Sequence, residues 1–173
     1  MNYFIITDAN GNGIGGGYNS GDLGAGQTAC TEAQSLNPTA YAVVSGEVVA
    51  APDSVLLAQA KTAQIALVTQ GYEAAIAAPV TYKTVAGVTA MFSTDSKAVS
   101  YLQSVIATGS TAWTANLWLS NSGTPLTPFT FADVQGLAAA IEARDTPDYQ
   151  ELLKLIGEIN AATTVTAVQT FTF

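Results

Sequence analysis

Short runs of β-forming residues, rich in Tyr, Val, Ile and Thr, occur in three stretches, each interrupted by turn-forming residues. Such runs are typical of strands, and Gly and Asn accept the backbone angles of tight turns. The pattern therefore predicts three hairpins: one from Tyr3 that turns at residues 8–13, one at Tyr41–Ala50 and one at Val80–Phe92. In the first hairpin the glycines continue to Gly26, which favours a long, flexible second arm.

Hydrophobic residues recur every three or four positions in longer stretches, which predicts amphipathic helices. One helix is expected over Asp53–Ala78, with Asp53 as its N-cap and Gly71 as a position where it could kink. The next is capped by Thr94 or Asp95 and ends at Gly109. A much shorter helix is expected between Thr31 and Leu36.

Two further helices are predicted near the C-terminal end. Thr130 and Asp133 form a capping signal for the first of them, and Thr146-Pro147 places proline in the first turn of the second. The tail from Thr164 fits either one more helical turn or a strand. The apolar stripes of the first and last long helices are Ile65, Val68, Tyr72 and Ile76, and Tyr149, Leu152, Leu153, Ile156 and Ile159.

These elements predict an α+β fold in which small antiparallel hairpins pack on about four helices. Hydrophobic residues make up 49% of the 173 residues, which is enough for a sizeable core. We expect a small β-rich N-terminal module over residues 1–52 and an α+β domain over residues 53–173.

Charged residues make up only 10% of the chain, against about 25% in an average globular protein. The net charge is −8, and the first sixty residues contain no Lys or Arg. Such a chain cannot follow a phosphate backbone or an anionic lipid surface, so neither nucleic acid nor membrane is expected as a partner. A weakly charged, polar surface instead favours contact with other proteins.

No residue set in the sequence supports catalysis, and we expect no enzyme activity. Cys30 is the one cysteine and the chain has no histidine, so a thiolate would lack its usual base. The N-terminus lacks the pattern of a signal peptide, and no apolar run reaches the length of a membrane span. We expect synthesis in a cytoplasm.

The glycine-rich turn matches two binding motifs in part. Gly11 to Gly16 fits a dinucleotide fingerprint, but no helix is predicted to start there, as pyrophosphate binding requires. Asp8, Asn10 and Asn12 resemble half of a calcium loop, whose twelfth position would need an acid and holds Asn19. A hairpin turn explains both patterns, so we expect neither a cofactor nor a metal.

Asp145 and Asp148 are the closest candidates for a pair of hydrolytic carboxylates. Because they flank the predicted helix start at Thr146-Pro147, a favourable interaction with the helix dipole is the simpler interpretation. Zinc is disfavoured as well, since its usual nitrogen and sulfur ligands are lacking.

Aromatic residues are the remaining candidates for function. Trp113–Leu119 alternates like a strand, which places Trp113 and Trp118 on opposite faces unless a bulge intervenes, and this weakens the case for a sugar-stacking pair. The terminal Phe171 and Phe173 need burial, either in a partner or against the same chain. With Tyr3 and Phe4 of the N-terminal hairpin, they form the candidate interface.

From about Val55 to Phe173 the order of elements resembles a phage tail domain family of unknown function. That family is found in tail-fibre and tail-fibre-assembly proteins. The features that carry the resemblance are the Ala-rich helix that ends at Ala78, the hairpin around Gly87, the capped helix after Thr94-Asp95-Ser96, the pair Trp113 and Trp118, the residues Leu126-Thr127 and Asp133, the run Leu137-Ala138-Ala139-Ala140, and the closing segment Ile156 to Thr164. The chain departs from the family in its Phe-Thr-Phe ending and in the low charge of the helix after Pro128.

The resemblance implies a non-enzymatic structural protein of a phage tail fibre, baseplate or tail tip, located in the virion tail. Its partners would be other tail proteins, and the family suggests a homo-oligomer, such as a trimer. One alternative is a fibre-assembly chaperone that is absent from the mature virion. Another is a receptor- or glycan-binding module.

Overall fold

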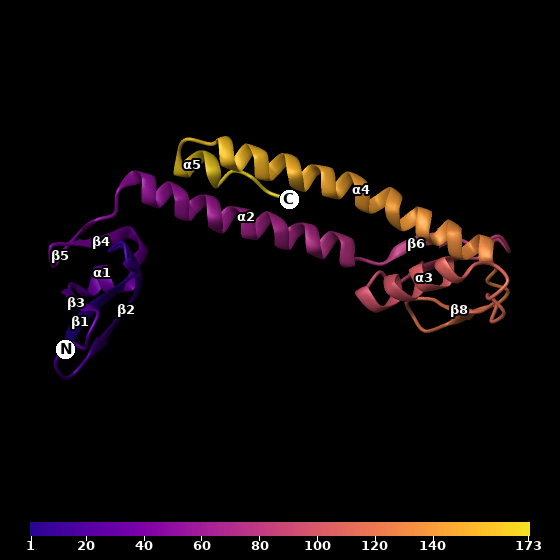
Figure 1. Ribbon diagram of the computed structural model, residues 1–173, viewed down its shortest axis with the longest axis horizontal. Helices are drawn as coiled ribbons and strands as arrows, with labels where there is room; N and C mark the ends of the chain where they lie inside the picture. Colours follow the sequence, from indigo (N-terminus) through magenta and orange to yellow (C-terminus); the bar gives the residue numbers. More distant parts are fainter. The chain divides into compact units, whose positions relative to one another are not determined.

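The computed structural model describes all residues, 1–173 (Figure 1). Five α-helices and four small antiparallel sheets confirm the predicted α+β class. The chain divides into two compact units. Residues 1–64 and 159–170 form the N-terminal unit, and residues 65–158 and 171–173 form the central unit. The predicted boundary at residue 52 stays a prediction.

The N-terminal hairpin is confirmed and belongs to a three-stranded sheet. Strand β1 (Asn2–Thr7) lies between β2 (Gly13–Asn19) and β3 (Gln27–Cys30). The Asp8 carboxylate closes the β1–β2 turn by accepting from the backbone N–H groups of Asn10 and Asn12 at 2.8 and 2.9 Å. The sequence did not predict β3, because its few residues follow a glycine-rich loop.

The glycines of β2 let other backbone segments approach the strand closely. A Cβ on Gly13 would lie 2.0 Å from the Pro38 carbonyl oxygen, and one on Gly16 would lie 2.2 Å from that of Ser35. Those carbonyls belong to the 3₁₀ helix η1 (Pro38–Ala40) and to α1 (Glu32–Leu36). The second arm is therefore a paired and closely packed strand, in contrast to the flexible arm that its composition suggested.

The other local signals of the N-terminal unit are confirmed. Thr31 caps α1 in a capping box with Gln34. Strands β4 (Tyr41–Val44) and β5 (Glu47–Ala50) pair across a turn in which both Ser45 and Gly46 have positive φ. After the long helix α4, the tail forms the helical turn α5 (Val165–Val168), so the helical alternative is the correct one.

The elements from residue 53 to residue 108 also follow the sequence pattern. Helix α2 (Asp53–Ala77) is continuous through Gly71, and strands β6 (Val80–Lys83) and β7 (Thr89–Phe92) form the hairpin around Gly87. Asp95 caps α3 (Ser96–Thr108) by accepting from the N–H groups of residues 97 and 98 at 2.9 Å. Thr94 does not cap α3: it donates to two carbonyls at the end of α2.

One long helix, α4 (Phe131–Ala161), replaces the two helices predicted here. Thr146-Pro147 lies inside it, and the prediction of a new start there is wrong. Buried residues continue on both sides, with Ile141 before the proline and Leu152 after it. That burial outweighs the cost of an interior proline, about 3 kcal/mol. Asp145 and Asp148 therefore lie mid-helix, and the dipole interpretation of their charges is wrong.

Pro147→Ala is expected to stabilise the protein by about 2 kcal/mol. Alanine restores the N–H that can bond to the carbonyl four residues earlier, while losing part of the rigidity that proline gives the unfolded chain. Urea unfolding followed by helical circular dichroism measures the effect, with Thr146→Ala as the control for a change of surface residue. If Pro147→Ala lowered the free energy of unfolding, the interior proline could not be destabilising α4.

The tryptophan segment differs from its prediction. Only Trp118–Leu119 forms a strand, β8, which pairs with β9 (Pro125–Leu126). Asn116 has a positive φ, so the backbone does not stay extended between the tryptophans. Trp113 and Trp118 consequently reach the same cluster, with ring centroids 5.9 Å apart, and the prediction of opposite faces is wrong.

The core of the central unit joins the β6–β7 hairpin to α3 and α4. Phe92 and Phe129 are fully buried with ring centroids 5.7 Å apart. The indole N–H of Trp113 donates to the Phe129 carbonyl at 2.8 Å, which satisfies a buried donor. The buried residues of this core are Val80, Phe92, Leu102, Val105, Trp113, Phe129, Val134, Leu137 and Ile141.

Candidate protein-interaction site

The four predicted interface residues lie in two pairs, one in each unit. Tyr3 and Phe4 are neighbours on β1, so their side chains point to opposite faces of the sheet. The Tyr3 ring meets Tyr18 edge-on at 6.2 Å, and the Phe4 ring lies over Gly17. Both rings are half-buried within the N-terminal unit, so they do not present one continuous patch.

The C-terminal pair lies against the central unit. Phe173 packs on Gly71 of α2, where an added Cβ would come within 2.8 Å of the Phe173 Cβ. Its ring meets Tyr72 edge-on at 5.9 Å, and Tyr72 in turn lies 6.1 Å from Tyr149 of α4. Docking on the same chain is therefore the observed placement, yet Phe173 stays 38% exposed. Phe171 is half-buried.

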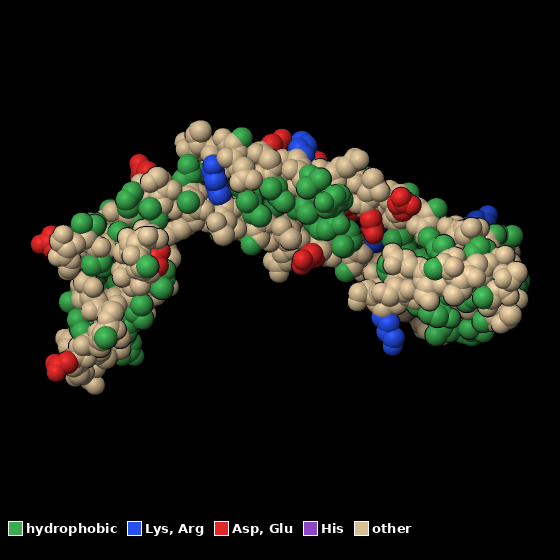
Figure 2. Space-filling view, viewed as in Figure 1, with side chains coloured by type: hydrophobic (Ala, Val, Ile, Leu, Met, Phe, Trp, Pro, Cys, Tyr) green, Lys and Arg blue, Asp and Glu red, His purple; other side chains and the backbone are tan.

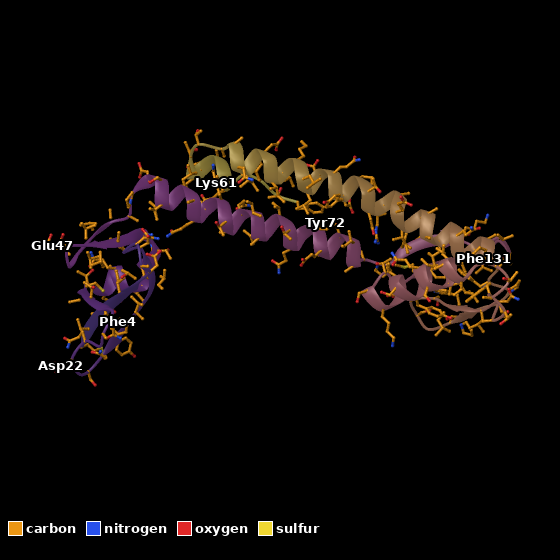
Figure 3. The ribbon with its side chains drawn as sticks, in the orientation of Figure 1. Phe4, Asp22, Glu47, Lys61, Tyr72 and Phe131 are labelled. Carbon is orange, nitrogen blue, oxygen red and sulfur yellow. The ribbon has the colours of Figure 1, made fainter.

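A groove adjoins this cluster between α3 and α4, and we call it the aromatic groove. Figure 2 shows hydrophobic side chains gathered near the C-terminal end of the chain, and Figure 3 shows Tyr72 pointing from α2 toward α4. The groove encloses about 660 Å³. Tyr149 and Leu153 on its wall are about half exposed, at 51% and 52%. Its lining residues are Tyr72, Val99, Leu102, Gln103, Ala138, Ile141, Glu142, Asp145, Thr146, Tyr149, Gln150 and Leu153.

Acidic groups border this apolar surface. Glu142 and Asp145 line the groove, and Asp145 is paired with Arg144 at 2.7 Å. The Arg144 guanidinium also donates to the carbonyls of Ile76 and Ala78, which are exposed acceptors at the end of α2. Arg144 is thus committed to holding α2 against α4, while Glu142 forms no ion pair within the protein.

Arg144→Ala is expected to lower the free energy of unfolding by about 1–3 kcal/mol, since it removes charge-assisted bonds to two helix-end carbonyls. Lys154→Ala is the matched control, because Lys154 lies on the same helix, is 59% exposed and pairs only with Glu151. Chemical denaturation of both variants tests the difference. Equal free energies of unfolding for the two variants would show that the hydrogen bonds from Thr94 are enough to satisfy the carbonyls at the end of α2.

The motifs with catalytic or cofactor chemistry are accounted for by structure. The glycine run lies in β2, so no helix begins at it. Hydrogen bonds from Asn12, led by its side-chain amide, hold the pKa of Asp8 below its ordinary value and occupy the carboxylate. No group of three or more His, Cys, Asp or Glu side chains is placed to hold a metal ion. Burial raises the pKa of the Cys30 thiol, which disfavours its reactive form.

The groove could be found only partly from the sequence. Tyr72 and Tyr149 were assigned to apolar helix stripes, and both do lie on the facing sides of α2 and α4. Periodicity identifies a helix face but not the gaps between helices, so it could not show that Tyr149 and Leu153 remain exposed beside a groove.

Comparison with protein-family models, with curated proteins and with solved structures finds no match to this chain. No helix is long and apolar enough to cross a membrane.

Proposed function

We propose that this chain is a non-enzymatic structural protein of a bacteriophage tail, in the fibre, baseplate or tail tip, that acts through protein–protein contacts. The observation that carries the proposal is the aromatic groove, where the side chains of Tyr149 and Leu153 are about half exposed. The resemblance of residues 55–173 to a phage tail domain family supports the assignment to a phage tail.

The groove has the composition of an interaction hot spot. Hot spots concentrate aromatic anchors in pockets from which a partner excludes water. Here the Tyr72 ring contacts Tyr149 and is itself packed against Phe173, so covering Tyr149 would cost little further side-chain entropy. The unpaired Glu142 at the border favours a partner segment that brings a Lys or Arg beside an apolar side chain.

Mass spectrometry of purified particles tests the proposal. Particles released from a strain that carries the gene are expected to contain the protein in a fixed ratio to other tail proteins. Absence from the particles, together with co-purification with the fibre from infected cells, would instead identify an assembly chaperone. Threefold assembly, which rests on the resemblance, is tested by light scattering of the purified protein.

A site-specific crosslink tests the role of the groove. A photo-reactive amino acid at residue 149 is expected to capture another tail protein in assembled particles, whereas the same group at Lys154 is not. Residue 154 provides the control because it is exposed on the same helix but does not line the groove. Equal capture at both positions would remove the groove from the proposed interface.

A further inference from the structure

A second groove lies at the opposite edge of α3, between the start of that helix and the β8–β9 hairpin. We call it the Tyr101 groove. It encloses about 540 Å³, within the range of small-molecule sites. Tyr101, Trp118 and Leu119 contribute apolar surface, whereas Asp95, Lys97 and Asn121 contribute polar groups. Nothing in the proposed tail interface uses this groove.

A stack of aromatic rings forms its apolar side. Phe129 is fully buried in the core, Trp118 lies 5.5 Å from it at 30°, and Tyr101 lies 5.3 Å from Trp118 at 32°. Tyr101 is 55% exposed at the outer end of this stack. The core therefore fixes the position of the outer rings before any ligand arrives, so little ordering entropy remains to be lost on binding.

Fixed polar groups stand beside the rings. Ser93 donates to Asp95 at 2.6 Å, and this bond, with those from the start of α3, holds the pKa of Asp95 below its ordinary value. Asp95 is thus an ionised acceptor at neutral pH. The backbone N–H of Asn121 donates to the Met91 carbonyl at 2.7 Å, while its side-chain amide makes no hydrogen bond within the protein. Asn121 can therefore both donate to a ligand and accept from it.

We propose that the Tyr101 groove binds a neutral saccharide. A sugar ring offers an apolar C–H face to Tyr101, at the outer end of the stack, and hydroxyl groups to Asp95 and Asn121, so it satisfies both kinds of surface at once. The charges of Asp95 and Lys97 offset one another, so the groove selects no net charge. A purely apolar segment would leave the Asn121 amide unpaired, and a phosphate would meet the Asp95 charge.

The test uses the whole protein on an array of neutral and charged oligosaccharides. Binding to neutral oligosaccharides is expected, and the best neutral binder is then titrated while tryptophan fluorescence is followed, because Trp118 lines the groove. Tyr101→Ala and Asn121→Ala are each expected to weaken binding by about tenfold, the size of a lost ring contact or of an unpaired hydrogen bond.

Tyr149→Ala is the matched control, because it removes another half-exposed tyrosine of the same unit from the other groove. It is expected to leave saccharide binding unchanged. The proposal is overturned by an absence of binding on the array, by binding of charged glycans alone, or by equal loss in Tyr101→Ala and Tyr149→Ala. None of these outcomes depends on whether the protein is found in virions.

Discussion

Asp133→Ala is expected to lower the free energy of unfolding of the central unit by about 3–5 kcal/mol, because it leaves two backbone donors without acceptors. The Asp133 side chain is fully buried. It accepts from the N–H of Val85 at 2.6 Å, and from the N–H and the hydroxyl of Thr130 at 2.7 Å each. One carboxylate thereby caps α4 and joins it to the turn of the β6–β7 hairpin.

Tryptophan fluorescence during urea unfolding measures this effect, because both tryptophans lie in the central unit. Glu158→Ala is the control, since it removes an exposed carboxylate from the same helix and is expected to change stability by less than about 0.5 kcal/mol. Asp133→Asn keeps the shape of the side chain but removes its charge. Because its NH₂ group cannot accept a hydrogen bond, we expect a loss of unfolding free energy between that of Asp133→Ala and that of Glu158→Ala. A loss below about 1 kcal/mol for Asp133→Ala would contradict this stabilising role of the Asp133 carboxylate, because one intramolecular hydrogen bond contributes about 1 kcal/mol and the carboxylate accepts three.

The same carboxylate makes stability depend on pH in a defined direction. Burial acts to raise the pKa of Asp133, but the hydrogen bonds from Thr130 and Val85 outweigh it and leave the pKa below its ordinary value. A lowered folded-state pKa means that the stabilisation is present above the unfolded value, about 3.9, and is lost as pH falls through the folded value. The free energies of unfolding of the wild type and of Asp133→Asn should therefore approach each other as the pH is lowered into the acid range.

Local chemistry predicted most of the fold. The caps predicted at Asp95 and Thr130 mark helix starts that the structure confirms, because each satisfies donors within three residues along the chain. The helix start predicted at Pro147 is wrong because proline's local preference for the first turn is outweighed by the burial of apolar residues on both sides of it. That burial depends on distant parts of the chain.

The candidate sites were less predictable than the elements. Phe173 stood out as an aromatic residue at a chain end, but its contact with Gly71 joins residues a hundred positions apart and has no local signal. Trp118 was assigned to a strand that would have separated it from Trp113, but the positive φ of Asn116 interrupts that strand. Both grooves depend on such long-range juxtapositions, which neither composition nor periodicity encodes.

Gly13→Ala is expected to destabilise the N-terminal sheet by about 3 kcal/mol or more, because the new methyl group would lie 2.0 Å from the Pro38 carbonyl oxygen. That oxygen belongs to the backbone of η1, so relief requires a shift of the chain rather than a rotamer change.

Gly21→Ala is the matched control for this prediction, since an added Cβ there meets nothing within 4 Å, and it is expected to be nearly neutral. Hydrogen exchange of the β1 amides resolves the N-terminal sheet and should show faster exchange in Gly13→Ala only. If the β1 amides of Gly13→Ala exchanged as slowly as those of the wild type, η1 would be able to shift without a loss of stability. The glycines of β2 would then need an explanation other than close backbone packing. Faster exchange limited to Gly13→Ala would instead assign the glycine-rich strand a packing role, which leaves the two grooves of the central unit as the surfaces on which function is tested.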